Sequence, residues 1–247
     1  MSSSDSLGDR MKAYEDVFRI KVTKRVPKVI RIDGKAFHTY LSDARKPYDT
    51  LVAEAMTKAT ASVIKEIGGT AKFAYVQSDE ASIVLNDHLD LNTQAWFDNN
   101  LQKIVSVSSS IFTATFNKEF GWTRKDTTLA FFDSRLIVLP DTNELCNYMV
   151  WRQQDAMRNS VQQYGRHYYS SNELHGKSCV EIKKMLLETN GVDFNQLEAW
   201  TTHGYIADRN SVNTTTKEVK LTAAPLFTEN REWIISNYNP VADVVST

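Results

Sequence analysis

The sequence predicts an α+β fold in which an antiparallel sheet carries helices on one face. Four short, β-rich runs have the length and composition of strands, at about residues 29–33, 71–77, 81–85 and 127–140. Only three residues separate the second run from the third, which is typical of a hairpin and therefore of antiparallel pairing. Segments of helical periodicity lie between the other runs. The order β, α, β, β, α, β is that of a ferredoxin-like sheet.

Five segments have the periodicity of helices. They cover about residues 9–19, 49–68, 91–120, 141–164 and 180–188, and the third carries the longest helical pattern. Asp49 is placed to cap the second helix, and Gly121 ends the third. Segments 204–208 and 216–221 can form a terminal hairpin, and the tail after Pro225 has no informative pattern. The C-terminal part is therefore expected to be a helical and hairpin extension of the sheet.

Two acidic residues interrupt apolar strands at positions that the predicted sheet can bring together. In VIRIDGKAFH, residues 29–38, the apolar run stops at Asp33, and Gly34 lets the backbone turn toward a ligand. Asp79 lies between the second and third strands, so the two carboxylates can share one end of the sheet. Such a pair is disfavoured unless a cation neutralises it. We therefore expect a site for two Mg²⁺ ions and nucleotide phosphates.

Each acid also has a simpler structural explanation. Asp33 alone is explained equally well as a strand-end acid that hydrogen-bonds a turn. Adjacent residues of a strand point to opposite faces, so Asp79 and Glu80 should differ in role unless the turn rotates one of them. The acid pair, rather than either residue alone, carries the functional interpretation.

Composition and charge are those of an ordinary globular protein. Of the 247 residues, 42% are hydrophobic and 24% are charged, and the net charge is −1. A nucleic-acid partner would therefore need a local basic patch. Cys146 and Cys179 cannot form a disulfide framework, and the N-terminus does not have the pattern of a signal peptide, so a cytoplasmic protein is expected. The spacing of His and Cys predicts no zinc site, and no apolar run is long enough to span a membrane.

Six motifs occur in one order along the chain, RIDG at 31–34, FH at 37–38, KP at 46–47, QSDE at 77–80, FDSR at 132–135 and WRQ at 151–153 followed by Asp155. Together, over residues 10–210, they resemble the tRNA-His guanylyltransferase superfamily. The resemblance implies a palm domain like that of DNA polymerases and nucleotidyl cyclases, with two Mg²⁺ ions. It also implies addition of nucleotides in the 3′-to-5′ direction at the 5′ end of a tRNA.

The resemblance implies roles for individual residues. Asp33, Gly34 and Asp79 would bind metal, and Glu80 would be a supporting catalytic carboxylate. ATP and GTP would contact a larger set, Asp33, Gly34, Lys35, Ala36, Phe37, His38, Lys46, Ser78, Asp79, Lys103, Arg135, Asn159 and Lys177.

Within that set the resemblance implies three kinds of contact. Backbone amides of residues 33–38 would cradle the triphosphate, and Phe37 would pack under the base or ribose. Lys46, Lys103 and Arg135 would hold phosphates. Lys177 would approach a phosphate or the tRNA end; its Gly-Lys-Ser context is not a Walker A motif, since a serine stands at position 171 where that motif has glycine. Most Lys and Arg residues are solvated surface groups, which is the alternative for each cation.

One departure from the eukaryotic pattern bears on substrate choice. Met157 stands where the eukaryotic enzymes carry a histidine associated with tRNA recognition, so the chain is more similar to the bacterial-type guanylyltransferase-like 3′-to-5′ polymerases. We expect template-dependent repair of tRNA 5′ ends. The alternatives are tRNA-His guanylyltransferase activity proper, a nucleotidyl cyclase-like activity and a noncatalytic tRNA-binding module. The expected partners are NTPs and the tRNA acceptor end, with no membrane, and the expected assembly is a homotetramer.

The chain length predicts one large domain or a domain with an appendage. Combined with the resemblance, it predicts a palm catalytic domain with an N-terminal helix over residues 1–140. Residues 141–247 are expected to form a C-terminal extension packed on the palm as part of one compact unit.

Overall fold

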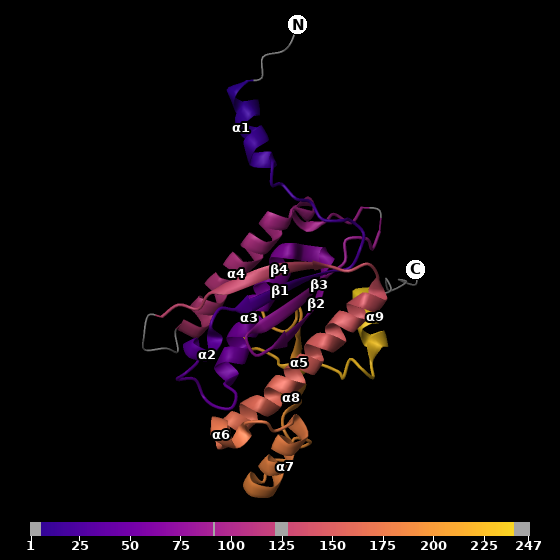
Figure 1. Cartoon of the computed structure of the whole chain (residues 1–247). Helices are drawn as coiled ribbons and strands as arrows, with labels where there is room; N and C mark the ends of the chain where they lie inside the picture. The colour runs from indigo at the N-terminus through magenta and orange to yellow at the C-terminus, as the bar shows by residue number, and fades with distance from the viewer. Residues whose placement is uncertain (1–5, 91, 122–127, 240–247) are drawn as a thin grey trace.

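The computed structural model describes residues 6–90, 92–121 and 128–239, which form a six-stranded antiparallel sheet flanked by helices (Figure 1). The sheet order is β4-β1-β3-β2-β5-β6. The strands are β1 (Lys28–Gly34), β2 (Ala71–Gln77), β3 (Glu80–Leu85), β4 (Phe132–Val138), β5 (Tyr205–Ala207) and β6 (Thr222–Ala223). The order of the first four strands confirms the ferredoxin-like prediction.

Two helices, α3 (Thr50–Ile67) and α4 (Leu101–Gly121), cover one face of the sheet and complete its main hydrophobic core. α3 begins where predicted, because the Asp49 carboxylate accepts a hydrogen bond of 2.9 Å from the amide of Leu51. The buried row of α3 packs against strand residues that point to this face, such as Ile30. Strand side chains alternate between faces, so the same strands present a second apolar surface on the other side.

That second surface is covered by α5 (Thr142–Tyr168) and α9 (Arg231–Tyr238), which pack against Val29, Phe73 and Tyr75 (Figure 1). The predicted helical layer therefore consists of α3 and α4, and the C-terminal part adds a layer opposite. α9 was not predicted. It is short, and its two buried residues, at positions 234 and 238, are too few for a periodic pattern.

The expectation that residues 91–120 form the longest helix is wrong. α5 has 27 residues and α4 has 21. The chain before α4 instead forms the 3₁₀ turn η2 (Trp96–Asn99), in which Phe97, Asp98 and Asn99 have positive φ angles of 50, 49 and 59°. A right-handed helix cannot continue through left-handed residues. Periodicity did not show this break, because Phe97 still packs against the core.

The C-terminal part contains a small helical cluster and a short sheet extension. α6 (Ser171–Leu174), α7 (Cys179–Asn190) and α8 (Ala199–His203) follow α5, and the cluster core joins α5, α6 and α7. α7 corresponds to the predicted helix at 180–188. Of the predicted hairpin, β5 lies where expected, but its partner β6 follows segment 216–221 instead of lying within it. The predicted strand at 127–140 corresponds to β4, and its first residue lies outside the described residues.

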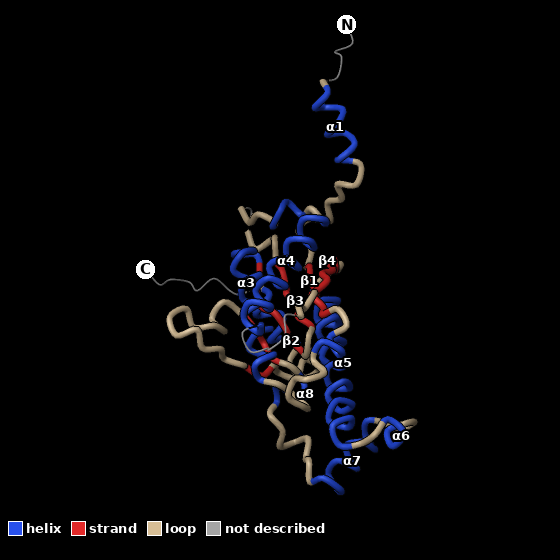
Figure 2. The backbone as a smooth tube through the Cα atoms, turned by 90° about the vertical axis from the view of Figure 1, so that its left-hand side faces the viewer, coloured by secondary structure: helices blue, strands red, loops and turns tan. Residues whose placement is uncertain are grey.

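The N-terminal helix α1 (Leu7–Asp16) stands away from the rest of the molecule and has no buried residue (Figures 1 and 2). It begins and ends slightly before the predicted span of 9–19. The remaining short elements are η1 (Gly68–Thr70), which leads into β2, and α2 (Phe37–Tyr40), which follows β1 directly. Among the described helices, none is both long enough and apolar enough to cross a membrane.

Candidate active site

Asp33 and Asp79 lie together at one end of the sheet. β1 pairs with β3 so that Asp33 is opposite Glu80, and the Gly34 amide donates a hydrogen bond of 3.1 Å to the Asp79 carbonyl. β2 and β3 are joined by a turn of only two residues, Ser78 and Asp79, in which Ser78 has a φ of +47°. This tight turn, together with the β1–β3 register, places the two acids side by side, as the sequence predicts.

The Asp79 carboxyl is costly to ionise in its present surroundings. Its pKa is raised from 3.8 to about 6; burial is the largest cause, the nearby Asp33 and Glu80 carboxylates also raise it, and a hydrogen bond from the Ser78 hydroxyl opposes the rise. No described Lys, Arg or His forms an ion pair with Asp79, and Arg31 lies 3.9 Å from Asp33. The acid pair is therefore only weakly neutralised by the chain itself.

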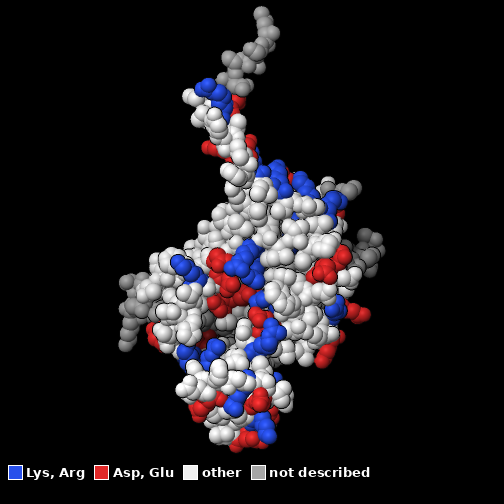
Figure 3. Space-filling view, in the orientation of Figure 1, with Lys and Arg blue, Asp and Glu red and all other residues white. Residues whose placement is uncertain are grey.

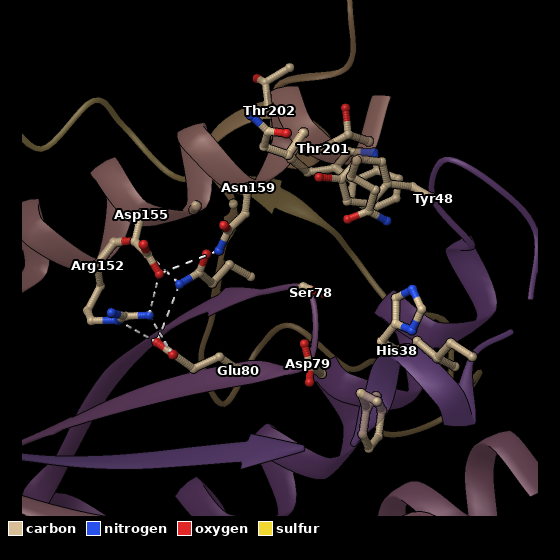
Figure 4. A pocket seen from close by; sticks show the side chains of 18 of the residues that line it. His38, Tyr48, Ser78, Asp79, Glu80, Arg152, Asp155, Asn159, Thr201 and Thr202 are labelled. Carbon is tan, nitrogen blue, oxygen red and sulfur yellow. Dashed lines mark hydrogen bonds and ion pairs between the residues drawn. The ribbon is translucent and has the colours of Figure 1, made fainter. Parts of the chain in front are cut away.

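Glu80 has a different environment from Asp79, as strand alternation predicts. Its two carboxylate oxygens accept hydrogen bonds of 2.7 and 2.6 Å from the Arg152 guanidinium, and both residues are buried. Arg152 also donates a bond of 3.0 Å to Asp155, one turn further along α5 (Figure 4). Glu80 is thus fully engaged in a bidentate ion pair that ties β3 to α5.

A cavity of about 990 Å³ opens above the acid pair, and acidic and basic side chains gather around this hollow (Figure 3). Its walls come from three segments: the chain after β1, the α5 helix and the loop around α8. The sequence-predicted residues that line it are Asp33, Phe37, His38, Lys46, Ser78, Asp79, Glu80 and Asn159. In the close view His38 lies on one side of Asp79, while Arg152 and Asp155 lie on the other (Figure 4).

The backbone that follows Asp33 is unusually tight. A Cβ built on Gly34 would lie 2.2 Å from the Phe37 ring, so no side chain fits there. Ala36 has a φ of +53°, and the Lys35 amide donates a bond of 2.8 Å to the Phe131 carbonyl. The chain therefore turns sharply into α2 directly beside the acid pair.

The structure gives Phe37 a core position. Its ring is 4% exposed and packs against Tyr40, Phe116 and Phe132, with centroid separations of 5.0, 5.5 and 4.8 Å. Little of the ring is left to lie under a base or ribose. Phe37 mainly packs in the core, although it is also part of the cavity lining. Its expected contact with a base or ribose stays a prediction.

Besides Lys35, which directly follows Gly34, three predicted cations do not line the cavity. Lys103 lies in the first turn of α4, where its ammonium is 5.8 Å from the Phe97 ring centre. Just before this turn, Asn99 hydrogen-bonds Asp87 beyond the end of β3, whereas Asp33 is opposite the start of β3. Lys177 is exposed in the loop before α7. Arg135 is on β4 beside Arg31 and forms an ion pair of 3.2 Å with Asp133. Of the three, Arg135 lies closest to the acid pair in register.

Several cavity residues were not predicted as site residues. They are Tyr48, Trp151, Arg152, Asp155, Gln162, Gln163, Arg166, His167 and the segment 200–202. The α5 members could have been found from helical spacing, because residues 155, 159, 162 and 166 are polar and share one face. Tyr48 and Trp200 carry no such signal. Tertiary packing alone brings their rings together, 5.9 Å apart.

Comparisons with known proteins indicate the family of this chain. A family described as tRNAHis guanylyltransferase matches residues 8–140. The probable tRNA(His) guanylyltransferase of Dictyostelium discoideum is 30% identical over 211 residues, which is 78% of this chain and 79% of that protein.

Two solved structures of a bacterial tRNA(His) guanylyltransferase-like protein are similar along almost the whole chain. The complex with ATP has 37% identity and a TM-score of 0.85, and covers 94% of this chain and 99% of that one. The complex with GTP has 36% identity and a TM-score of 0.76, with coverage of 95% and 99%. The predicted resemblance is confirmed: this chain belongs to the tRNA-His guanylyltransferase family of nucleotidyltransferases.

Proposed function

We propose that this protein adds nucleotides in the 3′-to-5′ direction to the 5′ end of tRNA, with the opposite strand of the acceptor stem as template. The observation that carries the proposal is the weakly neutralised pair Asp33 and Asp79 at the floor of a large polar cavity. The similarity to structures in complex with ATP and with GTP supports nucleoside triphosphates as substrates.

The residues present fit Mg²⁺. Asp33, Asp79 and the Gly34 carbonyl would hold it, since they are hard oxygen donors, and the raised pKa of Asp79 is what a carboxylate shows when no cation balances it. No described cluster of three or more His, Cys, Asp or Glu could hold a metal, so substrate oxygens would complete the coordination. When bound, Mg²⁺ lowers the pKa of an attacking hydroxyl and neutralises a pyrophosphate leaving group.

The chain itself orients the two substrates and supplies no nucleophile. Asp33, Phe37, His38 and Lys46 line the side of the cavity where the triphosphate would lie. In the reaction, the 3′-OH of the incoming nucleotide attacks the phosphorus that is bonded to the 5′-oxygen of the RNA. The bond to the leaving group breaks, which releases pyrophosphate from a 5′-triphosphate, or AMP from a 5′-monophosphate that ATP has first adenylylated.

The proposal is tested with a tRNA that lacks its 5′-terminal nucleotide and carries a 5′-triphosphate, incubated with Mg²⁺ and labelled NTPs. Sequencing of the product should show one nucleotide, complementary to the template base, restored at the 5′ end. Release of a cyclic nucleotide with unchanged RNA would instead indicate a cyclase. Binding of RNA without any turnover would indicate a noncatalytic module.

Substrate choice should follow base pairing. Met157 has a thioether, which cannot titrate near neutral pH or donate a strong hydrogen bond, so it cannot replace an imidazole in reading a base or phosphate. It is 38% exposed on α5 and lies outside the cavity lining. We expect efficient repair of several truncated tRNAs with matched NTPs, little preference for tRNA-His and weak addition of G opposite an unpaired A. Nontemplated G addition confined to tRNA-His would contradict this prediction.

We also propose a homotetramer. α1 exposes Leu7, Met11, Tyr14 and the following Phe18 at helical spacing, and their exposed fractions range from 46% to 73%. Apolar surface of this kind supports association between subunits. Light scattering at micromolar concentration should give four times the chain mass. Met11→Glu combined with Tyr14→Glu should yield a smaller species, and a monomeric wild-type protein would rule out the tetramer.

A further inference from the structure

An aromatic side chain on α5 lines the same cavity as the acid pair and has no role in the proposed metal and triphosphate contacts. Trp151 lines the cavity and is 48% exposed. A half-exposed indole leaves a large apolar surface in water, and exposed aromatic surface inside a polar cavity is typical of a binding site. The cavity thus has a flat apolar surface near its floor.

The Trp151 ring is held in place by its neighbours. The Arg152 guanidinium lies over the ring, with Cζ 4.5 Å from the ring centre, and Tyr148 packs against it edge-on at 5.7 Å. Arg152 is itself fixed by its two hydrogen bonds to Glu80, which is opposite Asp33 in the sheet. A chain of fixed contacts therefore connects the indole to the acid pair.

A planar ligand suits this arrangement. With the guanidinium on one face, the ring can accept a planar group on its other face. Every nucleobase has such a π-face, and stacking on an aromatic side chain tolerates any base, as templated addition requires. Bases at RNA ends and in single strands are commonly recognised in this way.

The position of Trp151 indicates which base it binds. Nucleotide transfer brings an incoming triphosphate and an RNA 5′ end together at Asp33 and Asp79. The proposed triphosphate contacts, including His38, lie on the side of the cavity away from Arg152 and Asp155 (Figure 4). Of the cavity residues on α5, only Asn159 is expected to contact a nucleotide, so the part of α5 that carries Trp151 remains for the RNA.

We propose that Trp151 stacks on the terminal base at the 5′ end of the RNA and so sets the position of its 5′ phosphate relative to Asp33 and Asp79. This inference rests on the proposed function and assigns Trp151 as the residue that binds the RNA end. Arg152 acts through Trp151 and Glu80 as a positioning residue.

The test measures binding of an acceptor-stem duplex that lacks its 5′-terminal nucleotide and carries a fluorophore at the far end. Fluorescence anisotropy gives Kd for the wild type, Trp151→Ala, Trp151→Leu and Trp151→Phe. We expect Trp151→Ala to weaken binding by roughly 5- to 150-fold, the range for loss of one stacked base. The affinity of Trp151→Leu for the duplex should fall by a similar factor, because leucine has no π-face. Trp151→Phe should retain most of the affinity.

Two controls separate stacking from general damage. Tyr168→Ala removes another exposed aromatic ring of α5, 42% exposed and outside the cavity lining, and should bind the duplex normally. A duplex whose 5′-terminal residue is abasic should bind the wild type more weakly than the intact duplex does, by the same factor. Trp151→Ala should bind the abasic and intact duplexes equally. If Trp151 had only a structural role, Trp151→Ala would still prefer the intact duplex.

The affinities for ATP and GTP, measured separately, should be the same in the three Trp151 variants as in the wild type. Loss of nucleotide affinity in Trp151→Ala would assign the ring to the incoming nucleotide, and normal duplex binding by Trp151→Ala would exclude a substrate contact; either result overturns the inference. A wild-type protein that binds the duplex through Trp151 but never extends it contradicts the proposed function and leaves this inference intact. Failure of the wild type to bind the duplex overturns both.

Discussion

Asp79→Asn should make the metal-free protein more stable at neutral pH while abolishing nucleotide transfer. The folded-state pKa of Asp79 is about 6, above the ordinary value of 3.8, so the folded protein holds the proton more tightly than the unfolded chain does. Below about pH 4 both states are protonated, and the group has no effect on stability. Between about pH 4 and 6 the unfolded state ionises first, and the free energy of unfolding falls.

Above about pH 6 Asp79 is ionised in both states, and its ionisation has lowered the free energy of unfolding by its full amount. For a rise of about two pKa units this amount is on the order of 3 kcal/mol. Asparagine keeps the shape and lacks the charge. The variant should therefore gain roughly 6 to 12 °C in Tm at pH 7.5, and the gain should vanish near pH 4. Mg²⁺ should raise the Tm of the wild type and leave that of the variant nearly unchanged. A variant less stable than the wild type at pH 7.5 without Mg²⁺ would show that Asp79 is already neutralised.

Breaking the Glu80–Arg152 pair should have the largest destabilising effect of any single ionic substitution in the site. Arg152→Leu leaves the buried Glu80 carboxylate without its partner, which costs about 3 to 5 kcal/mol. Urea unfolding measures the loss. The double variant Glu80→Leu with Arg152→Leu should recover part of it, because no buried charge then remains.

Arg158→Ala is the matched control for Arg152→Leu. Arg158 also pairs with Asp155 on α5, at 3.0 Å, but its side chain is 56% exposed. An exposed pair of this kind contributes at most about 1 kcal/mol. Equal losses from the two substitutions would show that the buried pair is not an anchor between β3 and α5.

The sequence predicted the features that depend on residues close together in the chain, and not the contacts between distant residues. β1, the β2–β3 hairpin and α3 arise from short-range patterns. The two acids meet once β1 lies antiparallel to β3, in the register that places Asp33 opposite Glu80. The Glu80–Arg152 pair joins residues 72 positions apart, and the 200–202 segment reaches the cavity through a separate loop. No local pattern reports such contacts.

The backbone also explains why Lys103 and Phe37 lie in positions that the sequence did not predict. Lys103 follows the left-handed turn at 97–99, which sets the start of α4 at the far end of the sheet. Phe37 is adjacent to the acid pair in sequence, yet the close approach of Gly34 directs its ring into the core. Proximity in sequence to Asp33 therefore did not decide how much of each side chain is exposed to the cavity.

The most direct test of the account is the Mg²⁺ dependence of 5′ extension by Asp33→Asn, measured in single turnover on the truncated, 5′-triphosphorylated tRNA. The wild-type rate should rise with Mg²⁺ and saturate. The variant keeps the shape of the side chain and loses one charged ligand, so its rate should fall by a factor on the order of 100 or more, most severely at limiting Mg²⁺, with the fold intact. A variant that extends the tRNA at a near wild-type rate in limiting Mg²⁺ would contradict the assignment of Asp33 and Asp79 as the metal-binding pair.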